Sequence, residues 1–165
     1  VPFIRPKELA NDFTPTAPVI AHTISEMGKK KYNYDYICCI YPCSPTLFID
    51  DLKTTLEIII QGDYNFIYPV TEYRHPIQRA LIRSSDGSVK LADPTSELIR
   101  TQDLQITYHD SGLFYWGKES AWIGNFKMHT DGITYIVPSW RTIDIDTEDD
   151  WKRAELLCES MKSFQ

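Results

Sequence analysis

The sequence lacks both a long apolar run and an excess of positive charge. Its apolar stretches, such as residues 37–41 and residues 56–60, which Glu57 interrupts, are far shorter than the roughly eighteen residues that a membrane-spanning helix needs. The 165 residues carry 17 basic and 23 acidic side chains, which gives a formal net charge of −6. The one basic run, Lys29 to Lys31, is too short to follow a phosphate backbone. We therefore expect no membrane insertion and no polymeric nucleic acid partner.

Motifs of two common classes of site are also missing. The cysteines are not paired at the spacings of zinc sites, because Cys38, Cys39 and Cys43 lie in or beside one apolar run. This pattern favours reduced thiols and a cytoplasmic location. No serine lies in a Gly-x-Ser-x-Gly turn, which argues against hydrolysis through a covalent serine intermediate.

Composition and length predict one domain. Apolar residues form 42% of the chain and charged residues 24%, as in soluble globular proteins. No repeat and no Ser/Gly/Pro-rich linker divides the chain. The chain opens on Val1-Pro2-Phe3-Ile4, with neither a leading strand nor a glycine-rich turn that could cradle phosphates. We therefore expect a single domain, residues 1–165, that is truncated at its N-terminus.

Apolar strand-like runs alternate with amphipathic helical segments along the chain. Helices are expected at residues 14–28, at 50–62 and from Thr147-Glu148-Asp149-Asp150, which has the form of a capping box. Strands are expected at residues 36–41, 64–70, 113–116 and 133–137, and a hairpin at 77–91 around Asp86-Gly87. The run at 36–41 is apolar on both faces, as in a deeply buried central strand. The alternation predicts an α/β fold, a mostly parallel sheet flanked by helices, with the hairpin as an excursion.

Two carboxylates, Asp144 and Asp146, flank Ile145 near the start of the last helix. The period of two in an extended chain places both carboxylates on one face and both neighbouring isoleucines on the other. Two aligned oxygen ligands suit Mg²⁺, which binds one or two carboxylates together with water and substrate phosphates. The alternative is that Asp146 or Thr147 caps the last helix and that Asp144 is solvated.

Three further polar segments are candidate binding sites. The segment that begins at Arg5 precedes a helix N-terminus, where an anion or a ribose could dock, or where a loop could simply be capped. The segment 73–79 suits either a carboxylate ligand or a solvated strand edge through its side chains Arg74, His75, Gln78 and Arg79. The neighbours His109 and Asp110 could act in acid–base catalysis or could be structural.

Five segments, taken in order, resemble motifs of the acylneuraminate cytidylyltransferase family, most closely its pseudaminic acid branch. The similarity covers nearly the whole chain. The segments that carry it are Ile4-Arg5-Pro6-Lys7-Glu8-Leu9-Ala10, Tyr41-Pro42-Cys43-Ser44-Pro45, Arg74-His75-Pro76-Ile77-Gln78-Arg79-Ala80, Tyr108-His109-Asp110-Ser111-Gly112-Leu113-Phe114-Tyr115-Trp116-Gly117 and Asp144-Ile145-Asp146-Thr147.

The resemblance implies a nucleotide-diphospho-sugar transferase-like fold and a CTP-dependent reaction. In that reaction the anomeric hydroxyl of a nine-carbon sugar acid attacks the α-phosphate, and pyrophosphate leaves. The resemblance implies that Asp144 and Asp146 are catalytic and hold Mg²⁺. It assigns Arg5, Thr16 and Tyr41 to the nucleotide. It assigns the sugar to the side chains Arg74, His75, Gln78, Arg79, Arg100, Gln102, Asp103, His109 and Tyr115.

The chain departs from this family pattern at two places. Tyr41 stands where the sialic acid enzymes have a glutamine, so pseudaminic acid is the expected substrate and N-acetylneuraminic acid the alternative. The family's first strand and its basic triphosphate loop are absent, so we expect little activity from this chain alone. A non-catalytic sugar-nucleotide-binding or oligomerisation module is a second alternative. The resemblance also implies a homodimer, which we expect to form through the Asp86-Gly87 hairpin.

Overall fold

The computed structural model describes residues 2–124 and 126–162. Its helices are α1 (Thr16–Lys29), α2 (Ile49–Gly62), α3 (Glu119–Ile123), α4 (Met128–Asp131) and α5 (Glu148–Lys162). Its strands are β1 (Tyr36–Ile40), β2 (Phe66–Glu72), β3 (Leu81–Arg83), β4 (Val89–Leu91), β5 (Tyr108–Asp110), β6 (Phe114–Lys118) and β7 (Gly132–Ile136). Short 3₁₀ helices are η1 (Lys7–Leu9), η2 (Ile77–Arg79), η3 (Pro94–Ser96), η4 (Thr101–Asp103) and η5 (Ser139–Arg141). None of the described helices is long and apolar enough to span a bilayer.

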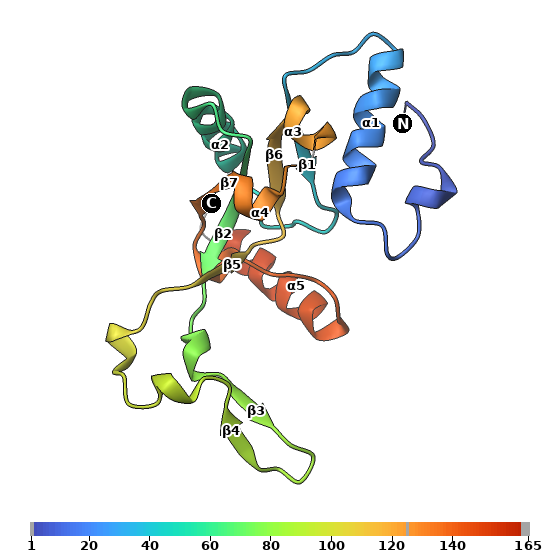
Figure 1. Cartoon of the computed structure of the whole chain (residues 1–165). Helices are drawn as coiled ribbons and strands as arrows, with labels where there is room; N and C mark the ends of the chain where they lie inside the picture. The colour runs from blue at the N-terminus through green and yellow to red at the C-terminus, as the bar shows by residue number, and fades with distance from the viewer. Residues whose placement is uncertain (1, 125, 163–165) are drawn as a thin grey trace.

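The main sheet is organised around β2 (Figure 1). Near its start, β2 pairs with β6 at Phe66 and Ile67, and near its end it pairs with β5 from Val70 onward. Along most of its length it also pairs with β7, with Phe66 opposite Gly132. β1 pairs with β6. β2, which pairs with β5, β6 and β7, is consequently the most buried of the described strands, since its residues 66–71 are all buried.

The expectation of a mostly parallel sheet is wrong. β6 lies between β1 and β2 and is antiparallel to both, and β5 is antiparallel to β2 as well. Within the described residues only β7 forms a parallel pair, with β2. β1, β2 and β7 still run in one direction, which is what alternating helices and strands encode. The alternation gives no sign that a later strand inserts between the earlier two.

The same insertion corrects the prediction for residues 36–41. β1 is neither central nor parallel to its neighbour, because in the described part of the chain it pairs with β6 alone. With one edge unpaired, its residues are half-buried instead of deeply buried, and Ile40 is exposed. An apolar run therefore marks a strand here but does not give its place in the sheet.

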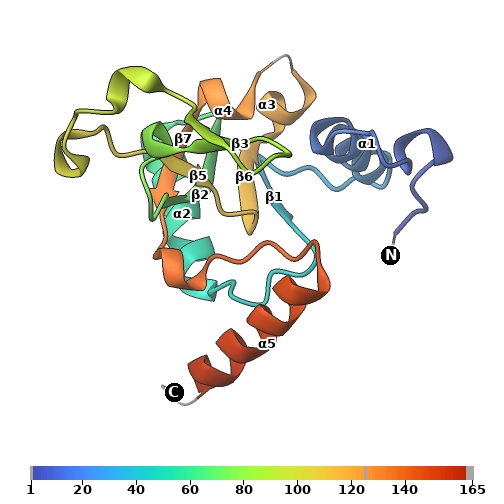
Figure 2. The same ribbon diagram turned by 90° about the horizontal axis from the view of Figure 1, so that it is seen from below.

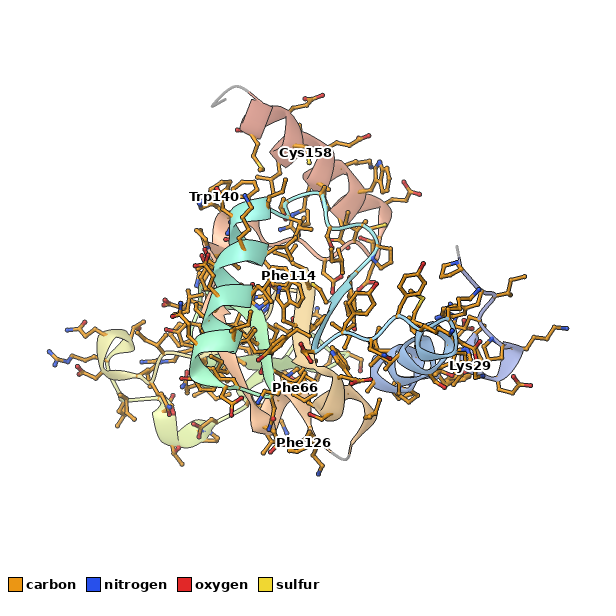
Figure 3. The ribbon with its side chains drawn as sticks, turned by 90° about the horizontal axis from the view of Figure 1, so that it is seen from above. Lys29, Phe66, Phe114, Phe126, Trp140 and Cys158 are labelled. Carbon is orange, nitrogen blue, oxygen red and sulfur yellow. The ribbon has the colours of Figure 1, made fainter. Side chains whose placement is uncertain are left out.

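Helices cover both faces of the sheet, as Figure 2 shows for α2 on one side and α1 with α3 on the other. On one face, Phe66 and Tyr115 pack with Trp122 of α3 and with Ile20 of α1. On the other face, the indole of Trp116 donates from Nε1 to the Leu52 carbonyl of α2 at 3.2 Å. Tyr115 and Trp116 are neighbours in a strand, so their side chains must point to opposite faces. Phe66 and Phe114 lie at the centre of the molecule (Figure 3).

Residues 73–107 leave the sheet between β2 and β5 and form an excursion that projects from the body (Figure 1). The predicted hairpin around Asp86-Gly87 is confirmed, with Leu81 paired to Leu91 and Gly87 in a left-handed conformation at φ 89°. Its first strand is shorter than expected, because residues 77–79 form η2. The excursion therefore rests on local pairing, away from the main core.

The cysteine side chains are free thiols. Cys38 and Cys39 are half-buried on β1. Burial raises the pKa of Cys38 to about 12 and also raises the pKa of Cys39. Thiols with raised pKa values remain protonated near neutral pH. The thiolate form, which binds metals and reacts with electrophiles, is therefore scarcely populated at Cys38 and Cys39.

Candidate functional site

The segment that carries Asp144 and Asp146 belongs to no described strand or helix. Ile143 is buried and Ile145 is half-buried, whereas both aspartates are exposed. The alternation expected from the sequence is thus present without strand pairing, because the isoleucines alone are enough to orient the segment. Both carboxylates point away from the apolar interior.

The N-terminus of α5 is capped by Thr147 and Asp150. The Asp150 amide donates to Thr147 Oγ1 at 3.2 Å, and the Thr147 amide and hydroxyl donate to Asp150 Oδ2 at 3.0 and 2.7 Å. This is a capping box with aspartate in the usual place of glutamate. The hydroxyl of Thr147 is the main reason why the pKa of Asp150 is lowered.

Capping therefore leaves the carboxylates of Asp144 and Asp146 unused. In the described residues neither carboxylate forms a hydrogen bond or an ion pair, although the Asp146 amide donates to Asp150 at 3.4 Å. The capping alternative weighed from the sequence holds for Thr147 and not for Asp146. Two exposed carboxylates without protein partners are available to a ligand.

A cavity of about 720 Å³ lies beside this pair. It opens where the ends of β2 and β7 meet, because these parallel strands finish on the same side of the sheet. Its wall is strongly acidic, with Glu72, Asp110, Asp144, Asp146 and Asp150 facing two guanidinium groups, those of Arg74 and Arg153. An anionic ligand would meet net negative charge here unless a cation accompanied it.

A buried ion pair fixes the chain just before the carboxylates. Arg141 Nη1 lies 2.6 Å from Asp51 Oδ2, with the two side chains 5% and 8% exposed. The guanidinium also lies 4.3 Å from the centre of the Phe48 ring, in a cation–π contact. η5 is thereby fastened to the N-terminal turn of α2, and the orientation of the following segment depends on this anchor.

Asp110 lies between the cavity and the core. One oxygen of its carboxylate accepts from the Tyr115 hydroxyl at 3.0 Å and the other from the Gly112 amide at 2.8 Å. Gly112 has φ 67°, and a Cβ there would lie 4.0 Å from Asp144 Oδ1. The turn thus places Gly112 beside Asp144, one of the two metal-binding candidates. Burial and the nearby charge of Asp110 raise the pKa of Tyr115, which remains a hydrogen-bond donor.

Two of the three predicted nucleotide residues contact each other. Thr16 Oγ1 lies 2.7 Å from the Tyr41 hydroxyl, and the Tyr41 and Tyr115 rings are 4.9 Å apart. Through Tyr115 this pair connects to Asp110 and hence to the cavity. Arg5 is exposed in the segment before η1 and does not line the cavity.

Of the predicted sugar-binding residues, Tyr115 is buried in the core and does not line the cavity, and the others fall into two groups. Arg74 and His109 line the acidic cavity. Arg74 Nε donates to Ser139 Oγ at 3.4 Å, and the His109 ring lies 4.7 Å from that of Tyr73, with Nδ1 2.8 Å from the Asp110 carbonyl oxygen. Gln102 lines a smaller neighbouring cavity of about 270 Å³ that Arg74 also borders. His75 is exposed and lines none of the described cavities.

The other group holds the excursion together. Gln78 Nε2 donates to the Gln105 carbonyl at 3.1 Å, and Arg79 Nη2 donates to the Ile99 carbonyl. Arg100 and Asp103 form an exposed ion pair at 2.7 Å. These side chains already have partners within the excursion, so the structure does not bring them to the carboxylates.

Three site features were missed from the sequence. Asp51 and Arg141 are far apart in the chain, and no local pattern signals their pairing. Trp140 lines the cavity, and its only sequence signal is its closeness to Asp144. Asp110 is not among the site residues predicted from the sequence, although its neighbour His109 is. The signal for Asp110 was an aspartate two residues before a glycine, which is typical of a side chain that fixes a turn.

Comparison with known proteins identifies the chain's relatives. No protein-family model matches it. It is 35% identical over 159 residues to the pseudaminic acid cytidylyltransferase of Campylobacter jejuni serotype O:2, covering 94% of this chain and 68% of that protein. The corresponding enzyme of serotype O:23/36 is 33% identical with the same coverage. N-acylneuraminate cytidylyltransferase B of Danio rerio is 26% identical over 81% of this chain and 32% of that protein. The chain belongs to the acylneuraminate cytidylyltransferase family and is a homologue of the pseudaminic acid cytidylyltransferases.

Proposed function

We propose that this chain is the part of a cytidylyltransferase that activates a nonulosonic acid, pseudaminic acid first among them, with CTP to give the CMP-sugar and pyrophosphate. The observation that carries the proposal is the pair of partner-free carboxylates, Asp144 and Asp146, in one cavity with Arg74. The relationship to pseudaminic acid cytidylyltransferases, which extends over 94% of the chain, supports the same chemistry.

The donor set fits Mg²⁺. Asp144 and Asp146 offer hard oxygen ligands, and in the described residues no third acidic, cysteine or histidine side chain joins them in a group that could hold a metal ion. An open site with two protein carboxylates is what Mg²⁺ requires when substrate phosphates and water complete its shell. When bound, Mg²⁺ supplies the positive charge that neutralises the triphosphate and the departing pyrophosphate.

The remaining residues bind and orient the substrates. Thr16 and Tyr41 bind the nucleotide, and their mutual hydrogen bond fixes the position of the tyrosine hydroxyl. Arg74 and His109, which line the same cavity as the two carboxylates, hold the sugar carboxylate. Once both substrates are bound, in-line positioning and charge neutralisation account for most of the rate enhancement.

Pyrophosphate release tests this function. Because the sequence does not contain the family's basic triphosphate loop, release with CTP and Mg²⁺ is expected to be slow, but faster with pseudaminic acid than with N-acetylneuraminic acid or without sugar. Asp146→Asn is expected to lower turnover by about 100-fold or more, on the order of the loss of one preorganised charge-stabilising group, with an unchanged circular dichroism spectrum. The matched control is Asp149→Asn, which changes an exposed aspartate that does not line the cavity.

The alternatives predict different results. Nucleotide binding without pyrophosphate release from any sugar would leave two interpretations, a non-catalytic binding module and an enzyme that needs the triphosphate loop. Release with N-acetylneuraminic acid alone would reassign the substrate. Turnover by Asp146→Asn equal to that of the unchanged chain would refute the metal assignment.

The excursion is the proposed homodimer contact. Its hairpin exposes Leu81, Ile82 and Val89, and Leu98 beyond it is 94% exposed. A two-stranded hairpin with both faces in water is marginally stable, so a second copy of the chain that covers these side chains would stabilise it. Sedimentation equilibrium should show a dimer, and Ile82→Asp should shift it to the monomer. We also propose a cytoplasmic location, where CTP is available and the four free thiols stay reduced.

A further inference from the structure

The acidic cavity has one large aromatic residue on its wall that the proposed mechanism does not use. Trp140 is 52% exposed and lines the cavity with Arg74 and Asp144. A half-exposed tryptophan beside charged groups gains little free energy from burial of its ring in the protein. Its exposed ring face is well suited to contact an apolar ligand surface. In Figure 3 it lies near the N-terminal end of α2, away from the buried Phe66 and Phe114.

Side-chain contacts of its two neighbours fix the backbone on either side of this indole. Ser139, just before it, accepts from Arg74 Nε at 3.4 Å. Arg141, just after it, is locked in the buried ion pair with Asp51 at 2.6 Å. η5 consists of these three residues, with Trp140 in the middle. Its neighbours are anchored while the indole remains half-exposed, so the ring is preorganised for a ligand.

The position of Trp140 assigns it to the sugar and not to the nucleotide. Thr16 and Tyr41 connect to the cavity through Tyr115 and Asp110. Trp140 instead follows the end of β7, next to Ser139, which accepts a hydrogen bond from Arg74. Trp140 therefore lies with the residue proposed to hold the sugar carboxylate. We propose that Trp140 is an aromatic platform that selects nonulosonic acids with apolar substituents, an inference that rests on the function proposed above.

The chemistry of the two candidate sugars differs at the groups that such a ring would meet. Pseudaminic acid carries two acylamino groups and ends in a methyl group, whereas N-acetylneuraminic acid carries one acylamino group and ends in a chain of hydroxyls. Methyl groups and C–H faces pack on an indole at little desolvation cost, while hydroxyls pressed against it lose water. Trp140 thus favours the more apolar acid.

Equilibrium binding tests the platform without turnover. Dissociation constants for pseudaminic acid and N-acetylneuraminic acid are measured by calorimetry with Mg²⁺ and a non-hydrolysable CTP analogue. Trp140→Ala is expected to weaken pseudaminic acid binding about tenfold, and Trp140→Phe, which keeps a ring, to weaken it less than about threefold. The discrimination between the two acids should shrink in Trp140→Ala, and the affinity for the CTP analogue should not change.

The chain offers a matched control in Trp151. This residue is 51% exposed and lies on α5, but it lines a separate apolar groove of about 450 Å³. Trp151→Ala should bind both acids as the unchanged chain does. Equal pseudaminic acid binding by Trp140→Ala and the unchanged chain would overturn the platform and leave the proposed function standing. Equal weakening of the CTP analogue and the sugar would overturn it too. Failure of the unchanged chain to bind either acid would overturn both proposals.

Discussion

Two regions of this molecule carry polar residues that a sequence motif marks as functional, and the structure uses them in opposite ways. In the carboxylate segment, residues 143–147, other side chains do the structural work and leave Asp144 and Asp146 without partners. In the excursion, residues 73–107, Gln78 and Arg79 donate to backbone carbonyls and are themselves structural. A motif identifies the residue, but only its partners show whether it is free for a ligand.

The sharpest way to break this contrast is to remove the anchor of the carboxylate segment. Asp51→Ala leaves the Arg141 guanidinium buried without its partner, which costs about 3–5 kcal/mol in the free energy of unfolding. Urea unfolding measures the change. Replacing both partners, with Asp51→Leu and Arg141→Met, should recover most of the loss, since no buried charge remains. A loss below about 1 kcal/mol in the single variant would show that the pair does not fasten the segment.

Two arginines of the excursion sequence allow the contrast to be tested with one residue type. Arg79→Ala removes a charged hydrogen bond to a backbone carbonyl and should cost about 1.5–3 kcal/mol of stability. Arg74→Ala, at an exposed position, should cost less than about 0.5 kcal/mol but should weaken pseudaminic acid binding. Unfolding and calorimetry on the same two variants separate the roles. If both variants behaved alike in both measurements, the division into structural and ligand-facing residues would be wrong.

Loss of the N-terminal cap of α5 is expected to have a smaller effect on the free energy of unfolding. Thr147→Ala removes the side-chain cap of α5 and should destabilise the chain by about 1 kcal/mol. Thr147→Ser keeps the hydroxyl and should cost a few tenths at most. Asp144 and Asp146 keep their charges in both variants, so Mg²⁺ affinity, measured by calorimetry, should change little. A large loss of Mg²⁺ affinity in Thr147→Ser would show that capping and metal binding are coupled.

Acid should loosen both regions by the same route. Hydrogen bonds from Thr147 lower the pKa of Asp150, and hydrogen bonds from Ser96 and Thr95 lower the pKa of Asp93 in the excursion. A lowered pKa in the folded state gives a stabilisation that is complete above the ordinary aspartate pKa of 3.8 and is lost as the pH falls through the folded value. Amide protection factors, which refer the hydrogen-exchange rate to the intrinsic rate at each pH, should be lower in both turns at pH 3 than at pH 5. Equal protection at both values would contradict this linkage.

Local features of the fold could be predicted from the sequence because they depend on local forces. The hairpin at Asp86-Gly87 follows from a turn that needs a positive φ, and the start of α5 follows from the capping pattern at Thr147. The alternation at Ile143 and Asp144 follows from the burial of isoleucine. Each of these signals lies within a few residues of the structure that it predicts.

Long-range pairings could not be predicted from a single sequence. Nothing in residues 36–40 or 66–72 shows that β6 will separate them, and the error in sheet type follows from that one insertion. The same limit applies to the site. Arg74 and Arg79 are the same residue type in one short segment, so the sequence does not distinguish their roles. The roles depend on the partners Ser139 and Ile99, which are distant from the two arginines in the sequence.

The insertion of β6 also sets an order of assembly. β1 can pair only after β6 has been synthesised, because Tyr36 lies opposite Lys118. The pairing of β2 with β7 likewise requires residues Gly132 to Ile136. Pairings between such distant segments form slowly, because the entropy of closing the loop is lost before the contacts are gained. During synthesis the apolar strands of β1 and β2 therefore remain without their partners until most of the chain has left the ribosome, and this interval is when the chain is most exposed to aggregation.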